Sequence, residues 1–91
     1  MIFGFSDIRG HGVFDRVFTA PPGLINRHST IFANICEISQ PQGQPLDFPF
    51  QGAATMEIYN IVPRDDNSVA VRIGVHWDSD LNVRLRFGIE T

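Results

Sequence analysis

The amino-acid sequence predicts an all-β fold, a single compact antiparallel β-sandwich of about six strands that spans residues 1–91. The main observation is a strict alternation of apolar and polar residues, which is typical of a strand with one buried face. It runs along Val69–Trp77 and resumes along Leu81–Ile89. A second observation is that no segment carries apolar residues at helical spacing. One-sided strands need a second sheet to cover their apolar face, and this requirement favours a sandwich.

The two alternating segments suggest a closing β-hairpin with the polar loop Asp78–Asp80. In this pairing Arg72 would lie directly opposite Arg86 on the outer face. Two arginines that face each other repel unless they are solvated or an anion lies between them. Glu57 and Glu90 are the nearest carboxylates that could form an ion-pair network there, in the same subunit or in a second one. A solvated face and an acidic ligand are the two alternatives.

The first third of the chain predicts one edge element and one strand. Met1–Ser6 is a short apolar piece that would form an edge strand or an arm laid on a neighbouring subunit. Two glycines in Asp7–Gly12 predict a turn. Val13–Thr19 alternates, with its phenylalanines on one face and its valines on the other. The adjacent prolines in Ala20–Gly23 end that strand.

The middle of the chain predicts two further strands separated by a long loop. Thr30–Ser39 is rich in β-branched and apolar residues, which is typical of a central strand. Gln40–Gln51 contains three prolines and is predicted to be a loop that folds its phenylalanines back over an open end of the core. Ala54–Val62 is the next strand, and Pro63–Asn67 turns the chain into the closing hairpin. We expect inward positions on that strand at Met56 and Ile58, with Val62 as a third candidate. Much of the core volume is expected to come from Phe14, Phe18, Phe32, Trp77 and Phe87.

Composition excludes several classes of protein. A net charge of −3 argues against binding to a nucleic-acid backbone, which requires an excess of basic residues. No apolar run approaches the roughly 18 residues of a membrane-spanning helix. The opening Met1–Ser6 lacks the basic start of a secretory signal, so we expect a protein that is cytoplasmic or released without a classical signal. With one cysteine, no internal disulfide is possible.

Catalytic and metal-binding patterns are weak, and we predict a protein that is not an enzyme and uses no cofactor. Cys36 lies among isoleucines and reads as a buried apolar residue. The three histidines lack the spacing of a zinc site. Asp78, Asp80 and Asn82 resemble the opening of a calcium loop, but Ile89 occupies the position of its closing glutamate.

The loop of the closing hairpin is the best candidate for a ligand site. Trp77 could stack on a sugar ring, because an indole face packs on C–H groups and its N–H is a donor. Its alternative is a place in the core beside Val75. Short polar side chains that could hold sugar hydroxyls surround it, although turn chemistry explains them equally well. The predicted ligand-binding residues are Trp77, Asp78, Asp80, Asn82, His76 and Arg72.

From Phe18 to Glu90 the sequence resembles the H-type lectins, a family of six-stranded sandwiches that includes snail agglutinins and the C-terminal domain of discoidins. The resemblance rests on three features: an aromatic residue followed by prolines, a tyrosine-containing strand end, and an aromatic residue near the end of each hairpin strand. These features fall on Phe18, Pro21, Pro22, Ile58–Ile61, Trp77 and Phe87. The sequence departs from the family near Gly52 and Ala53, where members carry a sugar-binding arginine, and in lacking disulfides.

Two functions follow as hypotheses. The resemblance implies a carbohydrate-binding protein whose weak glycan sites are repeated around a symmetric oligomer, with a homotrimer favoured. The alternative is a non-enzymatic assembly subunit, such as a component of a phage tail or another particle, that makes protein contacts only. Small size favours association in either case, because a short chain buries a modest fraction of its surface.

Overall fold

The computed structural model describes residues 1–39 and 48–90. It confirms the all-β prediction: these residues form strands and contain no helix. No helix that could span a membrane is found in the described ranges. The strands are β1 (Ile2–Gly10), β2 (Gly12–Thr19), β3 (Thr30–Ser39), β4 (Phe48–Phe50), β5 (Thr55–Pro63), β6 (Ser68–His76) and β7 (Leu81–Glu90).

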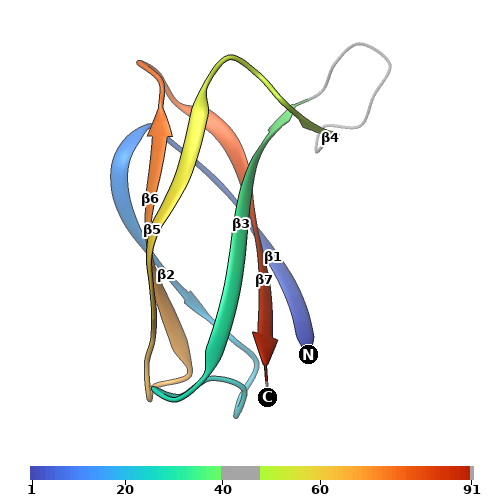
Figure 1. Cartoon of the computed structure of the whole chain (residues 1–91), viewed down its shortest axis with the longest axis vertical. Helices are drawn as coiled ribbons and strands as arrows, with labels where there is room; N and C mark the ends of the chain where they lie inside the picture. Colours follow the sequence, from blue (N-terminus) through green and yellow to red (C-terminus); the bar gives the residue numbers. More distant parts are fainter. Residues whose placement is uncertain (40–47, 91) are drawn as a thin grey trace.

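The strands form two antiparallel sheets that pack face to face (Figure 1). One sheet has the order β1-β7-β3-β4 and the other β2-β6-β5. The described residues hold seven strands where about six were expected, because β4 lies in Gln40–Gln51, which was predicted to be a loop. Residues 40–47 of that segment lie outside the described residues. The turn predicted at Asp7–Gly12 is also wrong for most of its length: β1 continues to Gly10, and only His11 separates it from β2. Gly12 has a φ of 72°, a value that glycine adopts readily.

The predicted hairpin between the last two strands is wrong. β6 pairs with β2 and β5, whereas β7 pairs with β1 and β3, so the two strands lie in different sheets. The physical reason is that each strand carries one apolar face. By crossing between the sheets at residues 77–80, the chain packs those two faces against each other at the centre of the sandwich. Arg72 and Arg86 therefore lie on opposite outer faces of the molecule and do not oppose each other.

The core lies between β6 and β7, as the alternation predicts. The side chains of Ile73, Val75, Val83 and Leu85 are completely buried. The five aromatic residues expected in the core differ in their burial. Phe87 is buried, and Phe14 and Phe18 pack on the edge of the core. The other two expected core residues are exposed, Phe32 by 55% and Trp77 by 44%. Phe32 lies on the outer face of β3, and Trp77 lies just beyond the end of β6. Alternation requires burial at neither position.

A β-bulge explains the one error in the inward face of β5. The pairing register between β5 and β6 shifts between Ile58 and Asn60. Met56 and Ile58 face the core as expected, but after the bulge Ile61 is the inward residue and Val62 is exposed. An extra residue in one strand reverses the faces of every later residue.

Asn67 joins the loops at the end of the sandwich that carries the termini. Its side-chain oxygen accepts hydrogen bonds from the backbone N–H groups of Leu24 and Ile25, at 3.0 and 2.8 Å. Its amide donates to the carbonyl groups of Ala20 and Pro21, at 2.7 and 2.9 Å. A φ of 65° places Asn67 in the left-handed region, which asparagine tolerates better than most residues. One side chain thus fixes the connection between β2 and β3.

Candidate functional site

The loop between β6 and β7 carries the predicted sugar platform. Trp77 follows β6 directly, and its backbone N–H donates to the carbonyl of Val75 at 2.9 Å. The exposure of its ring makes stacking physically feasible. The carboxylate of Asp78 is exposed and forms no hydrogen bond or ion pair with any described residue.

Two of the predicted sugar-binding side chains in this region are already bonded to the turn between β1 and β2. The carboxylate of Asp80 contacts the Nδ1 atom of His11 at 2.5 Å. The side-chain oxygen of Asn82 accepts a hydrogen bond from Arg9 at 3.3 Å. Sequence reasoning assigned both to a ligand because it could not anticipate that this turn lies beside them.

The remaining two predicted residues lie on the outer face of β6. The imidazole Nε2 of His76 lies 3.1 Å from the hydroxyl of Tyr59 and 3.7 Å from the carboxylate of Glu57. A hydrogen bond with Glu57 raises the pKa of Tyr59, with burial as a further cause. Arg72 binds Asp15 of β2 at 2.9 Å, and this hydrogen bond lowers the pKa of Asp15. The six predicted ligand-binding residues therefore do not form one site. Three lie in the loop between β6 and β7, two on the outer face of β6, and Asn82 on the outer face of β7.

Metal binding has no geometric support in residues 1–39 and 48–90, where no three His, Cys, Asp or Glu side chains cluster. Cys36 was expected to be buried, but it is only half-buried, because it lies on the outer side of its sheet, where β3 pairs it with Arg84 of β7.

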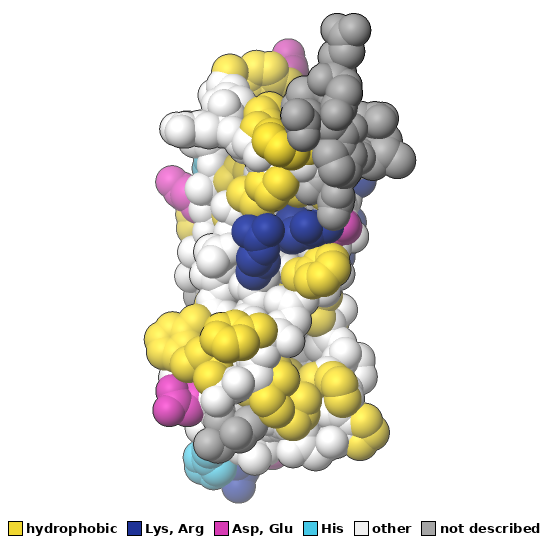
Figure 2. Space-filling view, turned by 90° about the vertical axis from the view of Figure 1, so that its right-hand side faces the viewer, with side chains coloured by type: hydrophobic (Ala, Val, Ile, Leu, Met, Phe, Trp, Pro, Cys, Tyr) yellow, Lys and Arg dark blue, Asp and Glu magenta, His cyan; other side chains and the backbone are white. Residues whose placement is uncertain are grey.

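The outer face of the four-stranded sheet is the feature that sequence reasoning missed. Figure 2 shows hydrophobic side chains on both sides of a central group of arginines. The exposed fractions are 59% for Met1, 77% for Phe3, 63% for Phe5 and 55% for Phe32. We call these four residues the aromatic face. Because they come from β3, β1 and the residue that precedes β1, they gather only when these strands flank β7.

A shallow depression lies in the aromatic face beside Gly88, near the end of β7. Phe3 and Phe32 both pair with Gly88 of β7, one from each side. Met1 and Phe3 pack over this glycine, since a Cβ atom there would lie 3.1 Å from the sulfur of Met1 and 3.6 Å from the ring of Phe3. A shallow depression of about 380 Å³ is lined by the rings of Phe3 and Phe32 together with Asn34 and Arg86.

The two arginines of β7 differ in their surroundings. Arg84 is 8% exposed and binds both carboxylate oxygens of Asp7, at 2.7 and 2.9 Å. Its guanidinium also lies over the ring of Phe5, 4.4 Å from the centroid. The hydrogen bond from Arg84 lowers the pKa of Asp7, despite the opposing effect of burial. Arg86 is exposed, and it forms no hydrogen bond with the described residues.

The outer face of the three-stranded sheet is also partly apolar, but none of the described phenylalanines is exposed on it. Val17 and Val62 flank the small Ala70 of β6. They are 55% and 49% exposed. The ion pair between Arg72 and Asp15 borders this row.

Comparison of the chain with protein-family models, curated proteins and solved structures finds no match. The resemblance to H-type lectins therefore stays a prediction, and the function has to be argued from the surface of the molecule.

One signal for the aromatic face is present in the sequence. Met1, Phe3 and Phe5 occupy alternate positions, as do the intervening Ile2 and Gly4. This arrangement indicates a strand with apolar side chains on both faces. Which face is left exposed depends on the strand order, which this pattern does not specify.

Proposed function

We propose that this protein is a non-enzymatic assembly subunit that associates with a second copy of itself through the aromatic face. The single observation that carries the proposal is the exposure of three phenylalanines and a methionine beside two arginines on the outer face of one sheet. Protein interfaces are enriched in aromatic residues, methionine and arginine relative to the rest of the surface. Exposed apolar patches on small soluble domains commonly mark such interfaces.

A second copy is the favoured partner because the face is complementary to itself. The shallow depression beside Gly88 is bordered by Phe3 and Phe32, so a ring of one copy can pack against the depression of the other. The same face carries the carboxylates of Asp7 and Glu90, which could accept hydrogen bonds from Arg86 of that copy. Both kinds of contact would be repeated by symmetry.

A face that meets its own copy closes as a two-fold dimer. The trimer expected from the sequence would need two different contact surfaces, for which the valines of the three-stranded sheet are the second candidate. The two outer faces point in opposite directions, so joining one to the other favours stacking over ring closure. We therefore favour a dimer as the smallest assembly unit.

Light scattering during size-exclusion chromatography tests the proposal. The wild type should elute with about twice the 10.2 kDa mass of one chain. Phe3→Glu and Phe32→Glu should each weaken association by roughly 30-fold or more, the effect expected for a central interface residue. Val13→Glu is the matched control, because Val13 is 60% exposed on the other sheet and its change should leave the dimer intact. A wild type that stays monomeric at high micromolar concentration would remove the proposal.

Carbohydrate binding is the second candidate, favoured by the exposed ring of Trp77 beside the free carboxylate of Asp78. Stacking contributes about 0.5–1.5 kcal/mol beyond buried area, so a single site would bind a sugar with roughly millimolar affinity. A broad glycan array tests it, with Trp77→Ala and Asp78→Ala expected to abolish retention. Asp80→Ala is a less specific probe, because Asp80 also anchors His11. An array on which the wild type retains no glycan would exclude this candidate.

A further inference from the structure

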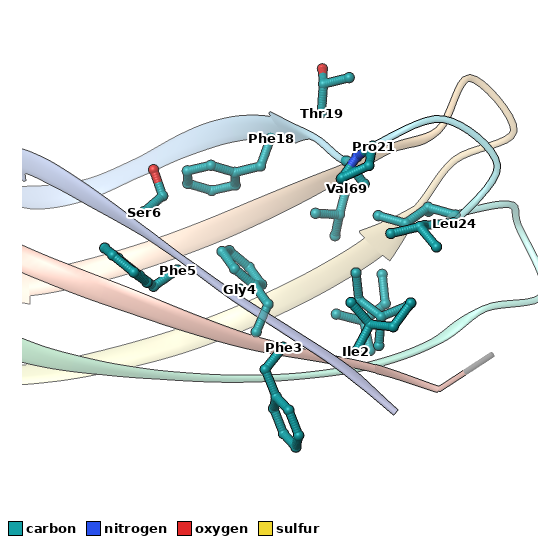
Figure 3. A pocket seen from close by; sticks show the side chains of 15 residues that line it. Ile2, Phe3, Gly4, Phe5, Ser6, Phe18, Thr19, Pro21, Leu24 and Val69 are labelled. Atoms are coloured by element: carbon teal, nitrogen blue, oxygen red, sulfur yellow. The ribbon is translucent and has the colours of Figure 1, made fainter.

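An apolar cavity opens between the two sheets. β1 and β2 are consecutive in the chain but belong to different sheets, and the cavity lies between them (Figure 3). It has a volume of about 320 Å³. Figure 3 shows Ile2, Phe18, Leu24 and Val69 around this space.

The cavity results from two small residues in β1. By register, the inward-facing residues of this strand are those paired with the core residues of β7. The central two of them are Gly4, opposite Phe87, and Ser6, opposite Leu85. A Cβ atom at Gly4 would meet no atom within 4 Å. The middle of β1 therefore supplies almost no side-chain volume to the core.

The walls are suited to an uncharged ligand. Phe18 and Phe87 form a tilted aromatic pair with centroids 5.1 Å apart, and Val69 and Ile89 are almost fully buried beside it. Among the described residues, no Asp, Glu, Arg or His side chain lines the space, and the side-chain polar groups that line it are the hydroxyls of Ser6 and Thr19. A charged group would enter it without a partner, which is strongly unfavourable.

The volume is sufficient for a small molecule. It is about twice that of an engineered apolar cavity of roughly 150 Å³ that binds benzene, and it lies at the lower end of the range for ligand sites. An apolar cavity with so few polar groups is a poor site for ordered water, which needs two to four partners.

We propose that this cavity binds an uncharged hydrocarbon ligand, such as a medium-length alkyl chain or a compact aromatic ring. Phe3 and Phe5 of the aromatic face also border the cavity, whereas Phe32 does not, so a change at Phe32 separates cavity binding from contacts at the aromatic face. The proposal thus goes beyond the assembly function and can fail independently of it.

Fluorescence titration with the neutral probe N-phenyl-1-naphthylamine tests this inference. The wild type should enhance and saturate the emission, and 1-decanol should displace the probe. Gly4→Leu places a side chain in the cavity, because Gly4 lines it and a Cβ atom there meets no described atom within 4 Å, and should weaken probe binding at least about tenfold. The same change should raise the melting temperature, because it adds buried apolar surface and removes a flexible glycine from a strand.

Two further variants keep the test decisive. Phe32→Ser removes an exposed ring from the aromatic face without touching the cavity, so it should bind the probe as the wild type does. If circular dichroism shows Gly4→Leu to be unfolded, Gly4→Ala should weaken binding more modestly, since its methyl group still enters open space. A wild type without saturable binding would overturn the inference. So would a folded Gly4 variant with unchanged affinity, or loss of binding in Phe32→Ser.

Discussion

Replacing Asp7 by Asn tests the most enclosed ion pair of the outer faces. The side chain of Arg84 is 10% exposed and that of Asp7 41% exposed. Hydrogen bonds to charged groups contribute about 1.5–3 kcal/mol, and the partial exposure of the carboxylate reduces this contribution. We expect Asp7→Asn to lower the free energy of unfolding by about 1–2 kcal/mol at pH 7. For a small domain with a urea dependence near 1 kcal/mol per molar, the midpoint would fall by about 1–2 M.

The same variant has a defined pH dependence. The pKa of Asp7 is lowered in the folded protein, mainly by its hydrogen bond from Arg84. Its stabilising contribution is therefore complete above the unfolded value of about 3.9 and is lost as the pH falls through the folded pKa. The difference between wild type and variant should be constant from pH 7 to about pH 5 and shrink below about pH 4.

Urea titrations at fixed protein concentration measure this difference. Asp15→Asn is the matched control, because it removes the corresponding carboxylate from the pair with Arg72, in which both side chains are more than half exposed. That pair should contribute little, since solvent screens it. Equal losses in the two variants, or a difference for Asp7→Asn that persists at pH 2, would refute this account of the enclosed pair.

Three other changes test the core, the loop anchor and the three-stranded face. Leu85→Ala truncates a fully buried side chain and should cost about 3–5 kcal/mol in urea denaturation; a smaller loss would mean that the core collapses around the site. Asn67→Ala removes four hydrogen bonds to the loop and should cost about 2–4 kcal/mol, whereas Asn67→Gly should retain the backbone conformation but not the bonds. Gly74→Val should displace the ring of Tyr59, which lies 2.7 Å from the position of a Cβ atom there. Ultraviolet titration of the phenol should then show its pKa returning toward the ordinary value, and an unchanged titration would contradict the contact.

Alternation in the sequence predicted the buried faces of β6 and β7 because burial on one side leaves a period of two. It could not predict the neighbours of these strands, since a strand with one apolar face fits a hairpin and a sandwich equally well. The partners of the arginines illustrate this limit. Asp15 and Asp7 lie 57 and 77 residues from the arginines they bind, and only the strand order brings them together.

The candidate sites show the same division between local and long-range information. The exposure of Trp77 was an open alternative that its position at a strand end allowed. The aromatic face depends on β1 and β3 flanking Gly88, a relation between three distant segments. The bulge at Tyr59 likewise has no clear signature among the β-branched and aromatic residues of β5.

Intermolecular nuclear Overhauser effects in a mixed sample of isotope-labelled and unlabelled protein test the central claim most directly. The proposed interface predicts contacts between copies at the rings of Phe3 and Phe32 and near Gly88, with none at Val13 or Val17. Contacts confined to those valines, or no intermolecular contact at a concentration where the aromatic face should be occupied, would contradict the account.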